Sequence, residues 1–209
     1  DFIDCANTWL YVVAKITAPN GDNLPDGEQV GPVNLFMHSL FSQVDIKLND
    51  KLITSSSNTY PYRAFIETFL NYGRDAKESQ LSSALWYKDT PGEHIESHDP
   101  AANGPNAGLS KRAAHTARSR AVEMIARLHS DIFFQEKLLL NGVGMHVRMV
   151  RMVRSNDKFA LLCANGGVAY KIKIMKAVLR MRKVRPSPDI SCWSLETSNA
   201  IYNLDRIEV

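Results

Sequence analysis

The sequence contains little cysteine and no paired cysteine motif. Its three cysteines, Cys5, Cys163 and Cys192, are odd in number and far apart, and no C-x-x-C pair occurs. This spacing excludes a zinc knuckle and a dithiol redox motif, and it is typical of buried free thiols in a reducing compartment. No apolar run approaches the ~18 residues that a membrane-spanning helix needs, so we expect no membrane span.

Sequence motifs for catalysis are also missing. There is no G-x-S-x-G, no P-loop and no G-x-G-x-x-G after a strand. His94, His98 and Asp99 have the spacing of metal ligands, but prolines and a glycine surround them. A solvated loop is therefore a better interpretation than a metal site, because no helix would fix that spacing. We expect no enzyme, no cofactor and no metal.

The composition is that of an ordinary globular protein. The chain has 209 residues, of which 44% are apolar and 22% charged, so it can bury a core without disulfide bonds. The formal net charge is only +3, and any surface for an acidic partner must be local. The chain begins at Asp1 on strand-like sequence and ends on strand-like sequence at 206–209, so we expect a piece of a longer polypeptide.

The first half of the chain predicts strands, a hairpin and a helical excursion. Residues 8–17 are rich in aromatic and β-branched residues, and residues 19–32 are a loop with three prolines. The alternating residues 44–48 and the segment 51–54 flank Asn49-Asp50, which is typical of a tight hairpin. Apolar residues at helical spacing over 62–70 predict a helix, and a second short helix is expected over 76–86.

The second half predicts a long loop and more strands. Residues 88–118 are polar and rich in turn-forming residues, so we expect a loop there. Residues 122–128 alternate as a strand does, and Asn141-Gly142 predicts a hairpin between 138–140 and a return strand from Met145. Short and long strands follow at 159–163 and 169–184. Seven or eight strands in all predict an antiparallel sandwich or barrel.

Cations are concentrated on the last long strand. Because alternate residues of a strand face the same side, Lys171 and Lys173 predict a basic face opposite a face that packs inward. This face could bind nucleic-acid phosphates, or it could be a solvated sheet face or a lysine-protected edge. We favour the solvated face, because aromatic residues are not interleaved on this strand. The candidate contact residues are Lys171, Lys173, Lys176, Arg180, Arg182 and Lys183.

An ordered series of short stretches resembles one known family. The stretches are LYVVAKI at 10–16, VGPVN at 30–34, HSLFSQV at 38–44, NTYPYRAFIET at 58–68, SQL at 79–81, WYKD at 86–89, NAGL at 106–109, HSDIFFQ at 129–135 and LLNGV at 139–143. Together they are similar to the major capsid proteins of Polinton/Maverick elements and the related adintoviruses. The similarity spans most of residues 5–209.

The resemblance implies an all-β fold, an antiparallel eight-stranded jelly-roll sandwich with a short helical insertion at about residues 60–86. Residues 1–202 would be the first of two jelly rolls, and residues 203–209 a possible start of the second. It implies a structural virion protein, a hexon-like major capsid subunit that forms trimeric pseudo-hexagonal capsomers of an icosahedral shell. The implied partners are further copies of the chain, neighbouring capsomers, a minor capsid or penton protein and encapsidated double-stranded DNA. The implied location is the virion, assembled inside the host cell.

Two other hypotheses stay open from the sequence. A β-sandwich binding module could contact nucleic acid through the basic strand face, and its affinity would then fall steeply with salt. An enzyme would need a pocket with convergent titratable groups, and replacing His94 or His98 by alanine would then abolish turnover. No constellation in the sequence meets that requirement, and we expect the chain not to be an enzyme.

Overall fold

The computed structural model describes residues 1–55, 57–91, 106–152, 159–163 and 168–185, and within them the strands pair antiparallel. One sheet has the order β5–β1–β8, formed by β5 (Val122–Ala126), β1 (Phe2–Thr17) and β8 (Lys171–Val184). A second has the order β4–β3–β6, formed by β4 (Lys51–Leu52), β3 (Phe41–Leu48) and β6 (Met145–Arg151). The short strands β2 (Val30–Pro32) and β7 (Leu161–Cys163) pair separately. The expected antiparallel β architecture is confirmed.

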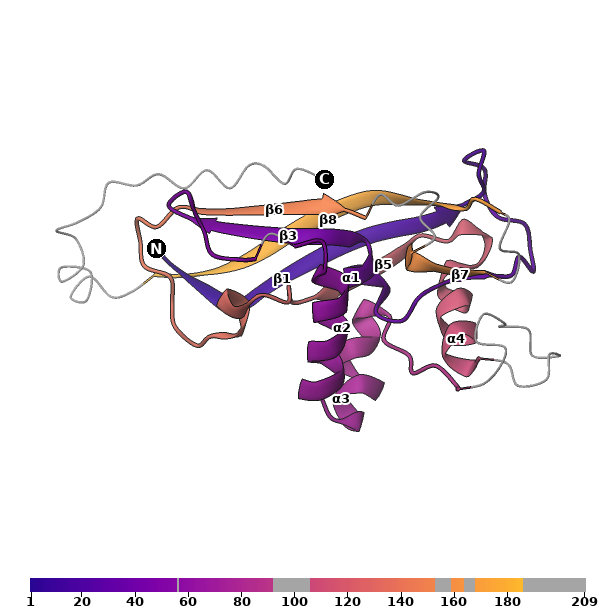
Figure 1. Ribbon diagram of the computed structural model, residues 1–209, viewed down its shortest axis with the longest axis horizontal. Coiled ribbons are helices and arrows are strands. Elements are labelled where there is room, and N and C mark those ends of the chain that lie inside the picture. The colour runs from indigo at the N-terminus through magenta and orange to yellow at the C-terminus, as the bar shows by residue number, and fades with distance from the viewer. Residues whose placement is uncertain (56, 92–105, 153–158, 164–167, 186–209) are drawn as a thin grey trace.

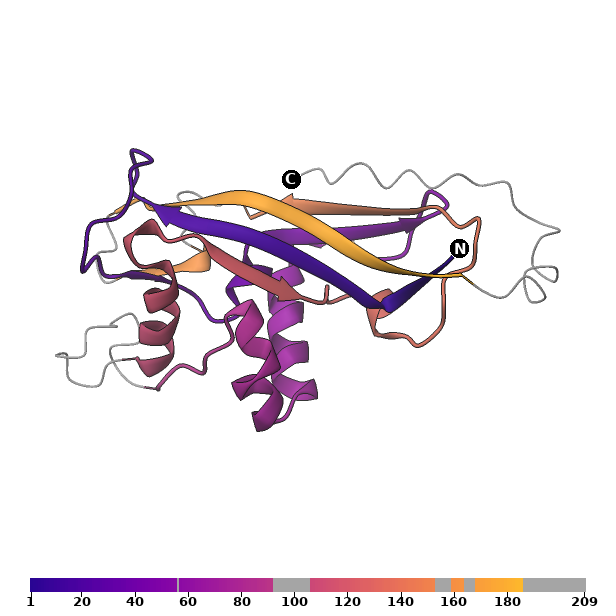
Figure 2. The same cartoon turned by 180° about the vertical axis from the view of Figure 1, so that it is seen from behind.

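The two larger sheets share one hydrophobic core. Along β1 the buried residues alternate with less buried ones, and Leu10 and Val12 face Leu179 and Ala177 of β8 across the ladder. Ile46 of β3 is fully buried in the same core. Figures 1 and 2 show β1, β8, β3 and β6 running along the length of the molecule, with α2, α3 and α4 on one side of them. The period-two pattern of the sequence therefore does bury one face of each long strand.

The hairpin at Asn49-Asp50 is confirmed. Lys47 pairs with Leu52 and Leu48 with Lys51, so the connection has two residues. Both have positive φ, 45° for Asn49 and 65° for Asp50. That geometry matches the right-handed twist of the flanking strands, and Asn and Asp tolerate it better than most residues.

The hairpin expected at Asn141-Gly142 is wrong. Leu139 forms an isolated bridge with Ile3 of β1, whereas β6 after the turn pairs with β3 in the other sheet. The dipeptide does form a turn, and Gly142 has a φ of 87°. The turn carries the chain from one sheet to the other, because the core-facing residues of β6 find their cross-strand partners on β3.

Helices interrupt the strands where the sequence predicted them, between residues 60 and 86. α2 spans Tyr60–Asn71 with a proline in its first turn, and α3 spans Arg74–Glu78. A 3-10 helix, η1, follows at Gln80–Ala84, in place of the continuous helix expected over 76–86. The remaining short helices are α1 (Phe36–Ser39), η2 (Ala117–Ser119) and η3 (Asp131–Phe134).

Two loops that the sequence predicted contain regular structure. Residues 30–32 of the loop at 19–32 form β2, which pairs with β7. Within the loop expected over 88–118, α4 spans Ala107–Thr116. The side chain of Asn106 caps α4 by accepting a hydrogen bond from the backbone N–H of Leu109 at 3.2 Å. The boundary at 202 and the segment 203–209 lie outside the described residues.

Candidate functional site

The six predicted contact residues all lie exposed on β8, and the structure brings five of them to one face. Cross-strand neighbours point to the same side of a sheet. Lys173 pairs with Lys15 and Lys176 with Val13, with a register shift between them that keeps both lysines on that side. We call this surface the basic face, and its residues on β8 are Lys171, Lys173, Lys176, Arg180 and Arg182. Lys183 pairs with the buried Ile3 and so lies on the opposite side.

Aromatic residues do lie among these cations, which corrects the prediction from the sequence. They come from β1 rather than from β8. Lys176 Nζ lies 5.7 Å and Arg180 Cζ 5.4 Å from the ring centroid of Tyr11. Arg127 Cζ lies 5.1 Å from the ring centroid of Trp9, whose side chain is exposed. Charge and aromatic surface are therefore adjacent on this sheet, the combination that binds single-stranded nucleic acid.

Acidic groups at the edges partly offset the charge of the basic face. A hydrogen bond with the Glu123 carboxylate raises the pKa of Tyr11, and the nearby charge of Arg180 opposes that shift. Arg182 lies 3.8 Å from a carboxylate oxygen of Asp4. Among the described residues, Lys171, Lys173 and Lys176 have no acidic partner within ion-pair distance. These three lysines keep the centre of the face positively charged.

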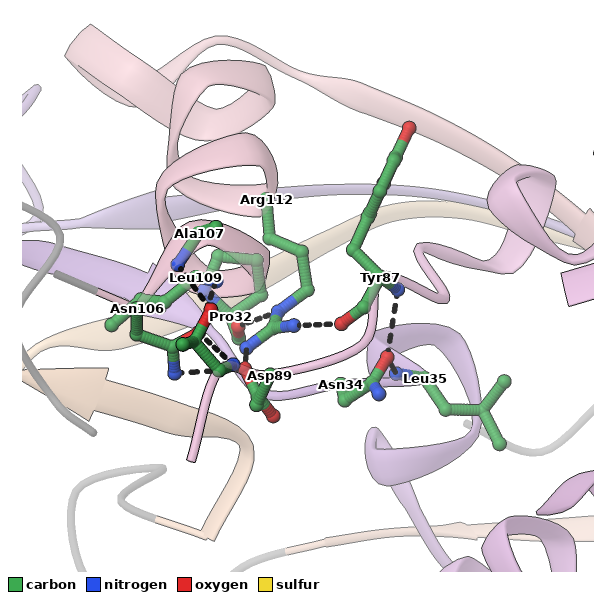
Figure 3. A network of polar contacts seen from close by, with 10 residues as sticks. Pro32, Asn34, Leu35, Tyr87, Asp89, Asn106, Ala107, Leu109 and Arg112 are labelled. Atoms are coloured by element: carbon green, nitrogen blue, oxygen red, sulfur yellow. Dashed lines mark hydrogen bonds and ion pairs between the residues drawn. The ribbon is translucent and has the colours of Figure 1, made fainter. Parts of the chain in front are cut away.

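A buried arginine holds α4 against the segment 86–90, which has no regular secondary structure (Figure 3). Arg112 is fully buried and donates hydrogen bonds to the carbonyls of Pro32 at 2.8 Å and Tyr87 at 2.6 Å. Its third partner is a carboxylate oxygen of Asp89 at 2.6 Å. Asn106 donates from Nδ2 to the same oxygen at 2.9 Å. Each nitrogen of the Arg112 guanidinium therefore has an acceptor, as a buried cation requires.

Gly108 lets α4 approach this segment closely. A Cβ placed at Gly108 would lie 2.5 Å from the backbone oxygen of Lys88, so any larger residue would push the helix away. The side chain of Asn34 also holds the segment 86–90 in place. Its Oδ1 accepts a hydrogen bond from the backbone N–H of Tyr87 at 2.9 Å. The sequence did not predict this site, because residues 88–118 were expected to form a loop and α4 lies within them.

A second cluster of polar groups is buried beneath α2. Nδ1 of His38 lies 2.9 Å from the hydroxyl of Tyr60, and that hydroxyl accepts from the backbone N–H of His129 at 3.3 Å. Nδ1 of His129 lies 2.8 Å from a carboxylate oxygen of Glu67. Burial lowers the pKa of both histidines, well below the usual value for His38, and for His129 the carboxylate of Glu67 opposes the shift. The buried rings therefore cross-link α2 to the sheets as neutral groups.

The described residues contain no group of three or more side chains arranged to bind a metal ion. The sequence candidates His94, His98 and Asp99 lie outside the described residues.

Cys5 is a buried free thiol, as the sequence predicted, and burial raises its pKa to about 11. The described part of the chain also holds no helix with the length and hydropathy to cross a bilayer.

The apolar side of α2 predicted from its spacing faces away from the core. We call it the α2 apolar face, and its residues, with exposed fractions from 43% to 72%, are Tyr62, Phe65, Ile66, Phe69 and Leu70. The opposite side of the helix is buried and consists of Tyr60, Pro61, Ala64 and Thr68. Apart from Tyr60 at its first turn, α2 therefore turns small residues toward the sheets and large apolar residues outward.

Comparisons with known proteins give one relative and no family. The chain is 24% identical over 173 residues to an uncharacterized protein of Caenorhabditis elegans, which covers 79% of this chain. The chain spans about 38% of the length of that relative. No family model matches the sequence, and no solved structure matches the fold at a significant level.

Proposed function

We propose that this chain is the jelly-roll portion of a major capsid protein of the Polinton/Maverick and adintovirus type, and that its role is to pack against further copies of itself. The observation that carries this proposal is the α2 apolar face. A soluble protein rarely exposes large apolar side chains together unless another surface covers them.

The size of the α2 apolar face supports a protein contact. Large side chains offer ~150–250 Å² each, so five that are about half exposed present roughly 500 Å² of apolar surface. A stable interface buries about 800 Å² on each partner. The face therefore supplies more than half of one side of such an interface, and contact with neighbouring loops would complete it.

The connectivity of the strands is compatible with a jelly roll. The long strands alternate between the two larger sheets along the chain, with β1, β5 and β8 in one and β3 and β6 in the other. Such crossing between facing sheets is typical of double-sheet jelly rolls. In the proposed capsid subunit the sheets provide a rigid frame, and the helices between them provide the surfaces for assembly.

Sedimentation velocity over a range of protein concentrations tests this proposal. We expect the 23.4 kDa chain to form species of about three times that mass, ~70 kDa, at high concentration. The double variant Ile66→Glu/Leu70→Glu should shift the distribution to the monomer while the circular dichroism spectrum stays unchanged, because both side chains are exposed. The matched control is Leu138→Glu, an exposed leucine outside the helix. A chain that stays monomeric at all concentrations contradicts the proposal.

A second candidate function is nucleic-acid binding through the basic face. The specific observation that favours it is the position of Lys176 and Arg180 over the ring of Tyr11. In that geometry the lysine and arginine contact phosphates while the exposed aromatic Trp9 stacks on a base. A steep fall of affinity with salt would distinguish this function from self-association through the α2 apolar face.

A further inference from the structure

A groove of about 830 Å³ lies between α3 and α4, and we call it the α3–α4 groove. Its floor is aromatic, with Phe69 of α2 followed by Trp86 and Tyr87 from the segment after η1. Its rim carries four cations and one acid, namely Arg74, Lys77, Lys88, Lys111 and Glu78. Its volume is within the ~300–1,000 Å³ of ligand pockets.

The net positive charge of the rim comes from three lysines, Lys77, Lys88 and Lys111, of which Lys77 already donates a hydrogen bond within the protein. Arg74 is paired with Glu78 at 2.7 Å, so this pair adds no net charge. Lys77 donates to the carbonyl of Phe69 at 2.7 Å. Lys88 and Lys111 are exposed and have no ion-pair partner among the residues that the structure describes. An occupant with negative charge would neutralise both.

The wall that carries these two lysines is rigidly held. Lys88 precedes Asp89, the partner of the buried Arg112, and Lys111 precedes Arg112 itself on α4. The close packing of Gly108 on the backbone of Lys88 fixes the spacing between the two segments. A preorganised pair of cations loses less freedom on binding than two independent surface lysines do.

The aromatic floor favours a polypeptide over a nucleic acid. A nucleobase needs an open ring face on which to stack. The ring of Phe69 has Lys77 at 4.7 Å from its centroid and Phe65 stacked beside it at 6.4 Å, and Trp86 is only 4% exposed. These rings therefore offer apolar edges for a side chain rather than faces for a base.

We propose that the α3–α4 groove is a docking site for an acidic polypeptide segment that carries an aromatic or aliphatic side chain. Carboxylates of the segment contact Lys88 and Lys111, and its apolar side chain lies against Phe69 and Tyr87. The groove shares Phe69 with the α2 apolar face, so an assembled chain and a docked segment would compete for that ring. Binding of the segment by a monomeric chain does not require the proposed capsid function.

Fluorescence anisotropy with the whole chain tests the proposal. The probe is a short labelled peptide with one phenylalanine flanked by glutamates, and two control peptides carry lysine for glutamate or glutamine for phenylalanine. We expect binding of the first peptide only. Lys88→Glu/Lys111→Glu should weaken it at least tenfold, because two attractions become repulsions. Lys51→Glu/Lys137→Glu changes the net charge equally at exposed sites that do not line the groove, and it should have little effect.

Several results would overturn the proposal. Equal loss in both double variants would mean non-specific attraction to the whole protein. Tighter binding of an oligothymidylate, lost in Lys88→Glu/Lys111→Glu, would assign the groove to phosphates. The sequence between 92 and 105 contains Glu93, Glu96 and Asp99 and no lysine or arginine. By contrast, peptide binding that appears only after these acids are replaced by amides would support the proposal, because an acidic segment of the chain would then have been competing for the groove.

Discussion

The rings of His38 and His129 meet edge to face in the interior, with their centroids 4.8 Å apart and their planes at 81°. His38 comes from α1, and His129 follows β5, so the contact joins distant parts of the chain beneath α2. The Tyr60 hydroxyl links the two residues, because it is hydrogen-bonded to Nδ1 of His38 and accepts from the backbone N–H of His129. Burial lowers the pKa of both histidines, and for His38 repulsion from a charged His129 ring would lower the pKa further.

The stability of the fold should therefore fall as the pH falls below about 6.5. Above that value both histidines are neutral in the folded and unfolded chains and contribute no pH dependence. Below it the unfolded chain binds protons that the folded chain excludes, since burial lowers the pKa of both groups. We expect the free energy of unfolding in urea to fall by up to about 1.4 kcal/mol per pH unit for each histidine between pH 6.5 and 5.

A variant that cannot titrate isolates the contribution of His38. His38→Gln should reduce the pH slope of the unfolding free energy even if it lowers stability at every pH. For His129 the carboxylate of Glu67, itself paired with Arg63 at 2.6 Å, opposes the shift, so His38 contributes the larger part. The control is His146→Gln, which removes an exposed histidine. An unchanged slope in His38→Gln would show that the buried pair does not control the acid sensitivity.

The Arg112 network should be among the most sensitive positions in the chain. Arg112→Met leaves the carbonyls of Pro32 and Tyr87 and the carboxylate of Asp89 without their donor. Breaking a buried ion pair from one side costs about 3–5 kcal/mol, and we expect a lower urea midpoint by a corresponding amount. Arg112→Lys should recover only part of the loss, because an ammonium group cannot match the three acceptors that a guanidinium reaches.

The control for this position is an exposed arginine. Arg118 pairs with Asp26 on the surface, where both side chains are more than two-thirds exposed. Arg118→Met should change the unfolding free energy far less than Arg112→Met does, as is usual for surface ion pairs. Similar losses at Arg112 and Arg118 would contradict the structural role of the buried network.

The sequence predicted most strands and α2, because period-two and period-3.6 patterns are local properties. It could not predict which side of α2 faces the sheets. The spacing of Phe65 and Phe69 marks an apolar side, yet Ala64 and Thr68 pack inward because small residues let the helix lie close to β3. Which side of a helix packs against the rest of the protein depends on tertiary contacts. The spacing of residues within the helix alone cannot show it.

The basic face gives a second example, because the sequence of one strand does not show which residues a neighbouring strand adds to its face. The sequence of β8 predicted a basic face without aromatic residues. The aromatic residues of that face, Trp9 and Tyr11, lie some 170 residues earlier in the sequence. The ladder between β1 and β8 brings them together.

The sequence failed to predict α4 for a different reason. Leu109, Arg112, Ala113 and Thr116 do follow helical spacing behind the Asn106 cap, but the turn-rich residues before them dominated the interpretation.

The turn at Asn49-Asp50 offers a stabilising substitution. Asp50 has a φ of 65°, where a residue with a Cβ is strained by about 1 kcal/mol and glycine is not. Asp50→Gly should raise the free energy of unfolding by about 0.5 kcal/mol, after the greater flexibility of glycine in the unfolded chain is subtracted. Asp50→Val should lower it. Thermal denaturation of both variants against the parent provides the measurement, and a destabilised Asp50→Gly would mean that the side chain of Asp50 is needed in the turn.

The basic face makes a quantitative prediction for nucleic-acid binding. If it binds single-stranded DNA, the logarithm of the affinity should fall linearly with the logarithm of salt, with a slope of about −0.7 for each phosphate contacted. Lys173→Gln/Lys176→Gln should make the slope shallower by about 1.4, because two contacts are lost. Trp9→Ala should weaken binding by about 1–3 kcal/mol without changing the slope, because stacking releases no counterions. Arg148→Gln, an exposed cation on β6 in the other sheet, is the control. A slope that responds equally to all these changes would exclude a defined site, and the cations of β8 would then serve only to keep an outward sheet face in water.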